Sequence, residues 1–134
     1  MGLNIFKTFA ANADKEQSGV EVEVGPEAFI TVARANNKTY SRMLTKAWEA
    51  NKYTLDRKDK AANDKAEELI IDIMSKSILL GWRGMLDEND QPLEYSQAAA
   101  KKMLAIGDFR QMVSKQADDF SNFRQVTEEA DAKN

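Results

Sequence analysis

The stretch of sequence that comes nearest to a chemical site is residues 81–96, GWRGMLDENDQPLEYS. Asp87 and Asn89 fall where an EF-hand loop carries its first calcium ligands. Such a loop also needs Gly at its sixth position for the sharp turn and Glu at its twelfth as a bidentate ligand. This chain has Pro92 and Ala98 at those positions. We therefore expect an acidic turn between helices and no bound metal.

The remaining residue types offer no catalytic centre. The chain contains no Cys and no His, which removes thiolate nucleophiles, imidazole bases and nearly all zinc and copper sites. Neighbouring carboxylates such as Glu67 and Glu68 diverge by about 100° on a helix and cannot share one proton. The glycines form no phosphate-binding or dinucleotide-binding loop. We expect no enzyme activity and no cofactor.

Bulk composition predicts one globular domain. The 134 residues are 43% hydrophobic and 31% charged, which is ordinary for a soluble protein. A net charge of −3 and a pI near 5.1 argue against nucleic acid as the main partner. No apolar run reaches the roughly 20 residues that cross a bilayer, so we expect no membrane association. We divide the chain into a polar lead-in (1–18), an α-rich domain (19–123) and an acidic, disordered tail (124–134).

The domain is expected to open with a β-hairpin. Residues 20–24 alternate Val with Glu, a turn follows at Gly25-Pro26-Glu27, and a β-branched run resumes to Arg34. Because side chains alternate across a strand, Ile30 and Val32 share one face of the second arm. A two-stranded ribbon needs support, so at least one arm should bury a face against helices.

Helical periodicity begins near Tyr40 and predicts about four helices. The first follows Asn37 or Thr39 as its cap, and the second, from about Ala61 to Leu80, should end at Gly81. The stretch 51–65 between them is either a loop or a helical extension. Ser96 and Asp108 can cap two further helices, with a break at Gly107. The predicted fold is mainly α with one small β-hairpin, and its expected core residues are Met43, Trp48, Ile70, Ile73, Met112 and Phe120.

Large apolar side chains beside the acidic turn suggest a partner-binding surface. The candidates are Trp82, Leu86, Leu93 and Tyr95, because a loop with several such groups could dock a helix. Folding of the loop back onto the core explains the same residues equally well. Helical stripes rich in Met and aromatic residues are usually core, although some can line a groove for a partner.

The order of these segments resembles the tail assembly chaperones of long-tailed bacteriophages. The resemblance spans residues 20–123. It rests on the run from Phe29 to Arg34 followed by Asn37 and Tyr40, and on a later group of residues. That group is Trp82, the acidic turn, Pro92, Leu93, Tyr95 and Ser96. Gln91 departs from the Gly or Lys that often precedes the Pro in that family, which bears on the shape of the turn.

The resemblance implies a non-enzymatic binding role in the host cytoplasm. Such proteins bind the tape measure protein, keep it soluble and help recruit tail tube subunits, and they are absent from the mature virion. Self-association and a longer, frameshifted form are further expectations. The alternatives are a structural virion component, such as a head–tail connector or tail-completion protein, and a helical transcriptional regulator.

Overall fold

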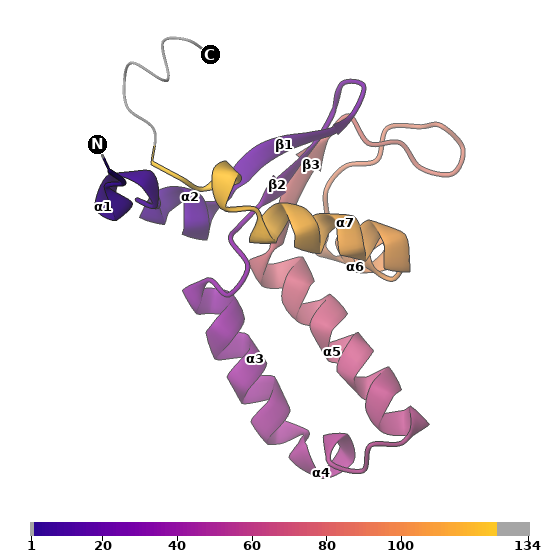
Figure 1. The fold of residues 1–134 in the computed structure, drawn as a ribbon. Helices are drawn as coiled ribbons and strands as arrows, with labels where there is room; N and C mark the ends of the chain where they lie inside the picture. Colours follow the sequence, from indigo (N-terminus) through magenta and orange to yellow (C-terminus); the bar gives the residue numbers. More distant parts are fainter. Residues whose placement is uncertain (1, 126–134) are drawn as a thin grey trace.

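A small antiparallel sheet, with short helices beside it and a pair of long helices projecting from it, makes up the molecule (Figure 1). The computed structural model describes residues 2–125. Its elements in chain order are α1 (Ile5–Thr8), α2 (Ala13–Ser18), β1 (Val20–Gly25), β2 (Ala28–Val32), α3 (Lys38–Ala50), α4 (Lys52–Leu55), α5 (Lys60–Ser77), β3 (Leu79–Arg83), α6 (Gln97–Leu104), α7 (Gly107–Asp118) and the 3-10 turn η1 (Phe120–Asn122). Together they form one compact α+β domain that is mostly helical, which confirms the predicted fold class.

The predicted hairpin is present as β1 and β2. The turn between them contains Pro26 and Glu27, and Glu27 adopts a left-handed φ of 58°. The valines of β1 and the buried side chains of Ile30 and Val32 pack against the helices. The alternation in the sequence therefore identifies the face of the hairpin that lies on the core.

The opposite face of the sheet is held together by Arg83. Its guanidinium lies 3.8 Å from the centre of the Phe29 ring. It also donates two hydrogen bonds of 2.8 Å to the carboxylate of Glu21. These bonds lower the pKa of Glu21 below its ordinary value. One side chain thus connects all three strands.

The third strand, β3, corrects the sequence prediction. The continuous helix expected from Ala61 to Leu80 ends at Ser77, and the next residues pair antiparallel with β2. Gly81 lies inside this strand opposite Thr31 and does not end the helix as predicted. The chain is therefore not all-alpha. Pairing with a strand distant in sequence decides the conformation of residues 79–83, and a local apolar pattern does not contain that information.

The elements α3, α4 and α5 form a helical hairpin that extends away from the sheet (Figure 1). The stretch 51–65 was predicted to be either a loop or a helical extension, and it contains both. It holds the short α4, a loop, and the start of α5. The carboxylate of Asp59 caps α5 by accepting a hydrogen bond from the Ala62 amide at 2.9 Å. That bond lowers the pKa of Asp59.

Asn37 joins the two ends of the hairpin where it meets the sheet. Its Oδ1 accepts a hydrogen bond from the Tyr40 amide at 3.0 Å, so of the two predicted caps of α3, Asn37 and Thr39, the structure has Asn37. Its Nδ2 donates to the carbonyl oxygens of Arg34 and Ser77, both at 2.8 Å. Since Ser77 is the last residue of α5, one buried amide fixes the start of α3 against the end of α5.

The core lies between the sheet and α5, α6 and α7. It consists of Ile30, Val32, Ile71, Met74, Ile78, Leu79, Ala100, Leu104, Val113, Ala117 and Phe123. Among the predicted core residues, Ile73 is buried, and Ile70 and Met112 pack against the core. The prediction is wrong for the other three, Met43, Trp48 and Phe120, which are half-buried and lie outside this cluster.

The two predicted C-terminal helices are present, but Gly107, the predicted break between them, is the first residue of α7. The Ser96 hydroxyl caps α6 by accepting from the Ala99 amide at 3.0 Å. Asp108 lies in the first turn of α7 and is not its cap, which is Ile106. After α7 the chain returns to the N-terminal segment, where the Asn12 amide donates to the Phe123 carbonyl at 2.8 Å and the Gln125 amide to the Ala10 carbonyl at 2.7 Å. Most of the predicted acidic tail, from residue 126, lies outside the described residues.

Candidate functional site

The acidic turn is built around the carboxylate of Asp87. Its Oδ1 accepts hydrogen bonds from the amides of Asn89 at 2.8 Å and Gln91 at 3.0 Å. The backbone of the same residue closes the turn, because its amide donates to the Gln91 carbonyl at 2.8 Å. This is the local bonding typical of an Asp that shapes a turn. Among residues 2–125, no three Asp or Glu side chains gather as a metal site.

The loop reaches this turn through a close approach of two backbones. Gly84 has a φ of 78°, which favours glycine, and a Cβ at this position would collide with the carbonyl oxygen of Glu27. Farther along, the Leu93 amide donates to the Met85 carbonyl at 2.9 Å. The start of the loop therefore lies directly against the turn of the β1–β2 hairpin, and a backbone hydrogen bond joins its two ends.

Two of the four predicted partner-binding residues hold this loop on the domain. Trp82 Nε1 donates to the carbonyl of Leu93 at 2.8 Å. The Trp82 and Tyr95 rings meet edge to face with centroids 4.9 Å apart. The Tyr95 hydroxyl lies 3.2 Å from the Leu79 carbonyl, and burial raises its pKa. These contacts support the alternative in which the loop folds back on the core.

The other two candidates divide between surface and interior. Leu86 keeps 56% of its surface exposed, and Leu93 is half-buried. Tyr95 is 37% exposed despite its hydrogen bonds. Trp82 thus lies in β3 and the other three in the loop that follows it, and of the four only Leu86 is mainly exposed.

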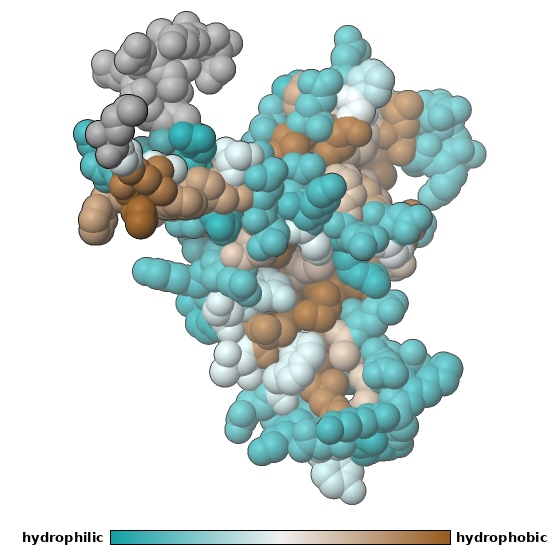
Figure 2. Space-filling view, in the orientation of Figure 1, coloured by the Kyte–Doolittle hydropathy of each residue, from teal (hydrophilic) through white to brown (hydrophobic). Residues whose placement is uncertain are grey.

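A groove between α3, α5 and α7 is a second surface with apolar residues, which the sequence did not single out. It has a volume of about 490 Å³. Its apolar lining residues are Ala35, Tyr40, Ile70, Met74, Ile78 and Ala117, and its polar lining residues are Asn36, Gln111, Ser114, Lys115 and Asp118. Figure 2 shows brown and white side chains in the depression between the helices, bordered by teal ones.

The signal for this groove was present in the sequence but ambiguous. Tyr40, Ile70 and Met74 all belong to helical stripes, and such stripes are usually buried in the core. The three helices meet near the sheet end of the hairpin, where Tyr40 and Ile70 stay half-buried while Met74 lies in the core. Only the angle between the helices reveals this, and that angle cannot be read from periodicity.

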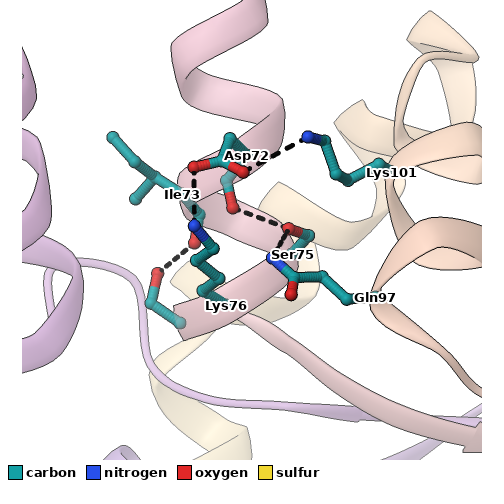
Figure 3. A network of polar contacts seen from close by, with 7 residues as sticks. Asp72, Ile73, Ser75, Lys76, Gln97 and Lys101 are labelled. Atoms are coloured by element: carbon teal, nitrogen blue, oxygen red, sulfur yellow. Dashed lines mark hydrogen bonds and ion pairs between the residues drawn. The ribbon is translucent and has the colours of Figure 1, made fainter.

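A cluster of polar side chains joins α5 to α6. Asp72 accepts from Lys76 at 3.1 Å and from Lys101 at 3.3 Å (Figure 3). Burial raises the pKa of Asp72, but the hydrogen bonds from the two lysines lower it by more, so the net shift is downward. The adjacent Ser75 hydroxyl donates to the Asp72 carbonyl at 2.6 Å, and Gln97 contacts Ser75 at 3.4 Å. Each group already has a partner, and the cluster joins the two helices.

Residues 35–134 match the model of the YdaY prophage protein family. The chain belongs to the YdaY prophage protein family. No curated protein and no solved structure matches it. The phage origin implied by the resemblance to tail proteins is thereby confirmed.

The part of the chain that matches the YdaY family contains both candidate surfaces. Residues 35–134 include the whole helical hairpin, the acidic turn and α7. All residues that line the groove fall within this span, and the strands β1 and β2 lie before it. None of the helices in the described residues is long and apolar enough to cross a membrane.

Proposed function

We propose that this YdaY-family protein is a non-enzymatic tail assembly chaperone. It binds the tape measure protein of its phage, keeps that protein soluble and helps to recruit tail tube subunits. The observation that carries the proposal is the apolar groove between α3, α5 and α7. Its volume of about 490 Å³ accommodates several apolar side chains of a bound helix, whose own stripe would complete the packing.

The physical reason for such a role lies in the partner. A long helical chain that exposes an apolar stripe before it is coated aggregates readily. A groove with an apolar floor and a polar border covers part of that stripe, while the outer surface of the chaperone stays in water. Tyr40, the residue that α3 contributes to the groove, is half-buried in the protein alone and so leaves surface for a partner.

Co-expression with the tape measure protein of the same prophage tests the proposal. The wild-type chain should raise the soluble fraction of the tape measure protein and copurify with it. Ile70→Glu places a charge at the groove and should abolish both effects. Ile106→Glu is the matched control, since Ile106 is 61% exposed and lies outside the groove. A third variant, Leu86→Glu, tests the loop surface separately. Solubilisation that survives Ile70→Glu in a folded protein would refute the groove as the binding site.

Mass spectrometry of purified virions separates this role from a structural one. An assembly chaperone leaves before the particle is complete, so its peptides should be absent from mature virions. A head–tail connector or tail-completion protein would be present in every particle.

A further inference from the structure

A row of cations runs along the outer side of α3. Lys38, Arg42 and Lys46 recur every fourth residue, which places them on one stripe of the helix. All three are exposed. The whole chain carries a net charge of −3, so this cationic row is a local exception to its overall charge.

The charge pattern of α3 opposes the stability of the helix. Lys38 occupies the first helical position, and Glu49 lies in the last turn. The helix dipole favours the reverse arrangement, with acids at the start and bases at the end. Cations four residues apart also repel one another. A pattern that local stability disfavours is more readily explained by what the surface binds.

Cations on α5 are arranged differently. Lys60 pairs with Asp64 at 3.0 Å, and Lys76 pairs with Asp72 at 3.1 Å. Across residues 2–125, no ion pair includes any member of the cationic row. The positive charge of α3 is therefore not neutralised within the described part of the fold.

The same side of α3 offers a shallow apolar surface between its charges. The hollow is lined by Ser41, Arg42, Thr45, Lys46, Glu49 and Ala50. Small side chains and the aliphatic stems of Arg42 and Lys46 form its floor, while their charged ends remain in water. Such a surface fits a second helix laid against α3.

We propose that the cationic row binds an acidic face on a helix of the partner protein. The inference rests on the proposed function and adds a charge requirement to it: the groove takes apolar side chains of the partner, and the row, on the other side of α3 from Tyr40, takes Asp and Glu side chains of a second helical segment of the same partner. We choose an acidic helix face as the occupant because its negative charges complement the positive charges of the row. Nucleic acid is a different class of partner for the same row, and a DNA duplex in the test below distinguishes it.

Two synthetic helical peptides with the same apolar stripe test the inference. In one the flanking positions are glutamate, and in the other they are lysine. Fluorescence anisotropy with the full chain should show roughly tenfold tighter binding of the glutamate peptide at low ionic strength, since three exposed ion pairs together give a preference of that order. The preference should shrink in about 0.5 M salt.

The variant Arg42→Glu/Lys46→Glu should remove or reverse the preference. The control Lys102→Glu/Arg124→Glu makes the same change in net charge at exposed positions outside α3 and should keep it. Far-ultraviolet circular dichroism confirms that both variants are folded. Equal binding of the two peptides by the wild type, binding of neither, or a preference that survives in Arg42→Glu/Lys46→Glu would overturn the inference.

A 20-base-pair DNA duplex serves as the third probe. Binding of the duplex that is tighter than that of the glutamate peptide, and lost in Arg42→Glu/Lys46→Glu, would assign the row to nucleic acid instead. The proposed function can fail separately, because it is judged by soluble tape measure protein in the groove variant. Equal binding of both peptides would leave the groove in place and remove only the charge requirement.

Discussion

The helix α5 buries six of its eighteen residues, whereas the neighbouring α3 buries none of its thirteen. The two helices also differ in whether their cations have acidic partners. Both Lys60 and Lys76 on α5 have acidic partners four residues away, and the cationic row of α3 has none in the described residues. The buried side chains of α5 and these two lysines thus find their partners within the domain. Helix α3 lies beside it with surface left for another molecule.

This difference is compatible with the proposed role, in which a small stable domain also binds an apolar partner. The buried side of α5 packs with the sheet, α6 and α7, and these contacts supply most of the hydrophobic stabilisation. Because α3 contributes less to the core, its surface can serve binding at a small cost in stability. Four tests probe this division, from the largest expected effect to the smallest.

Truncation of a buried residue on α5 should have the largest effect. Ile73→Ala is expected to lower the free energy of unfolding by about 2–5 kcal/mol, because it leaves a cavity at a position that is 2% exposed. Leu44→Ala on α3 removes a half-buried side chain and should cost less than about 2 kcal/mol. Urea denaturation measures both. Equal losses would contradict the division between the two helices.

Asn37→Ala should destabilise the joint between the two helices by about 2–3 kcal/mol. It removes the cap of α3, which contributes about 1 kcal/mol, and leaves the Ser77 carbonyl without its side-chain donor. Ser96→Ala removes an exposed cap alone and should cost about 1 kcal/mol. The difference between the two urea midpoints isolates the contribution of the joint. If Asn37→Ala is no worse than Ser96→Ala, Asn37 acts only as a cap.

The Asp72 cluster should add a small acid sensitivity to α5. Its folded-state pKa lies below the ordinary value, so its contribution is fully present above the unfolded pKa and is lost as the pH falls through the folded one. Between about pH 5 and about pH 3, the wild type should lose more stability than Asp72→Asn, by less than about 1 kcal/mol. Parallel pH profiles for the two proteins would show that Asp72 contributes nothing.

The charge at the start of α3 should have the smallest effect, and of the opposite sign. Lys38→Glu replaces a cation with an acid at the first helical position and should stabilise the free protein by about 0.3–1 kcal/mol. The same substitution should weaken binding of the glutamate peptide. A variant that is more stable but binds less would show that α3 carries its charges for a partner, and tighter binding would contradict this.

Local structure was predictable where local chemistry determines it. The caps Asn37 and Ser96 and the alternation of Val20 to Val24 each depend on neighbours within a few residues, and all three predictions are confirmed. The strand β3 was missed because Leu79 and Leu80 continue the apolar pattern of α5. Only pairing with β2 reveals that these residues are extended.

The errors in the core and the site have a similar origin. Phe120 lies beyond the end of α7, in a 3-10 turn that shifts the inward position to Phe123. Met43 and Trp48 form a real helical stripe, but α3 packs mainly along one helix and stays half open. Of the α3 stripe only Tyr40 lines the groove, so the half-open positions of Met43 and Trp48 lie elsewhere on the helix.

Hydrogen–deuterium exchange of the complex with the tape measure protein tests the central claim most directly. The account predicts that binding slows exchange in α3 and in residues 107–118 of α7, with little change in the loop at residues 84–96. Protection confined to that loop, or none in α3, would contradict it.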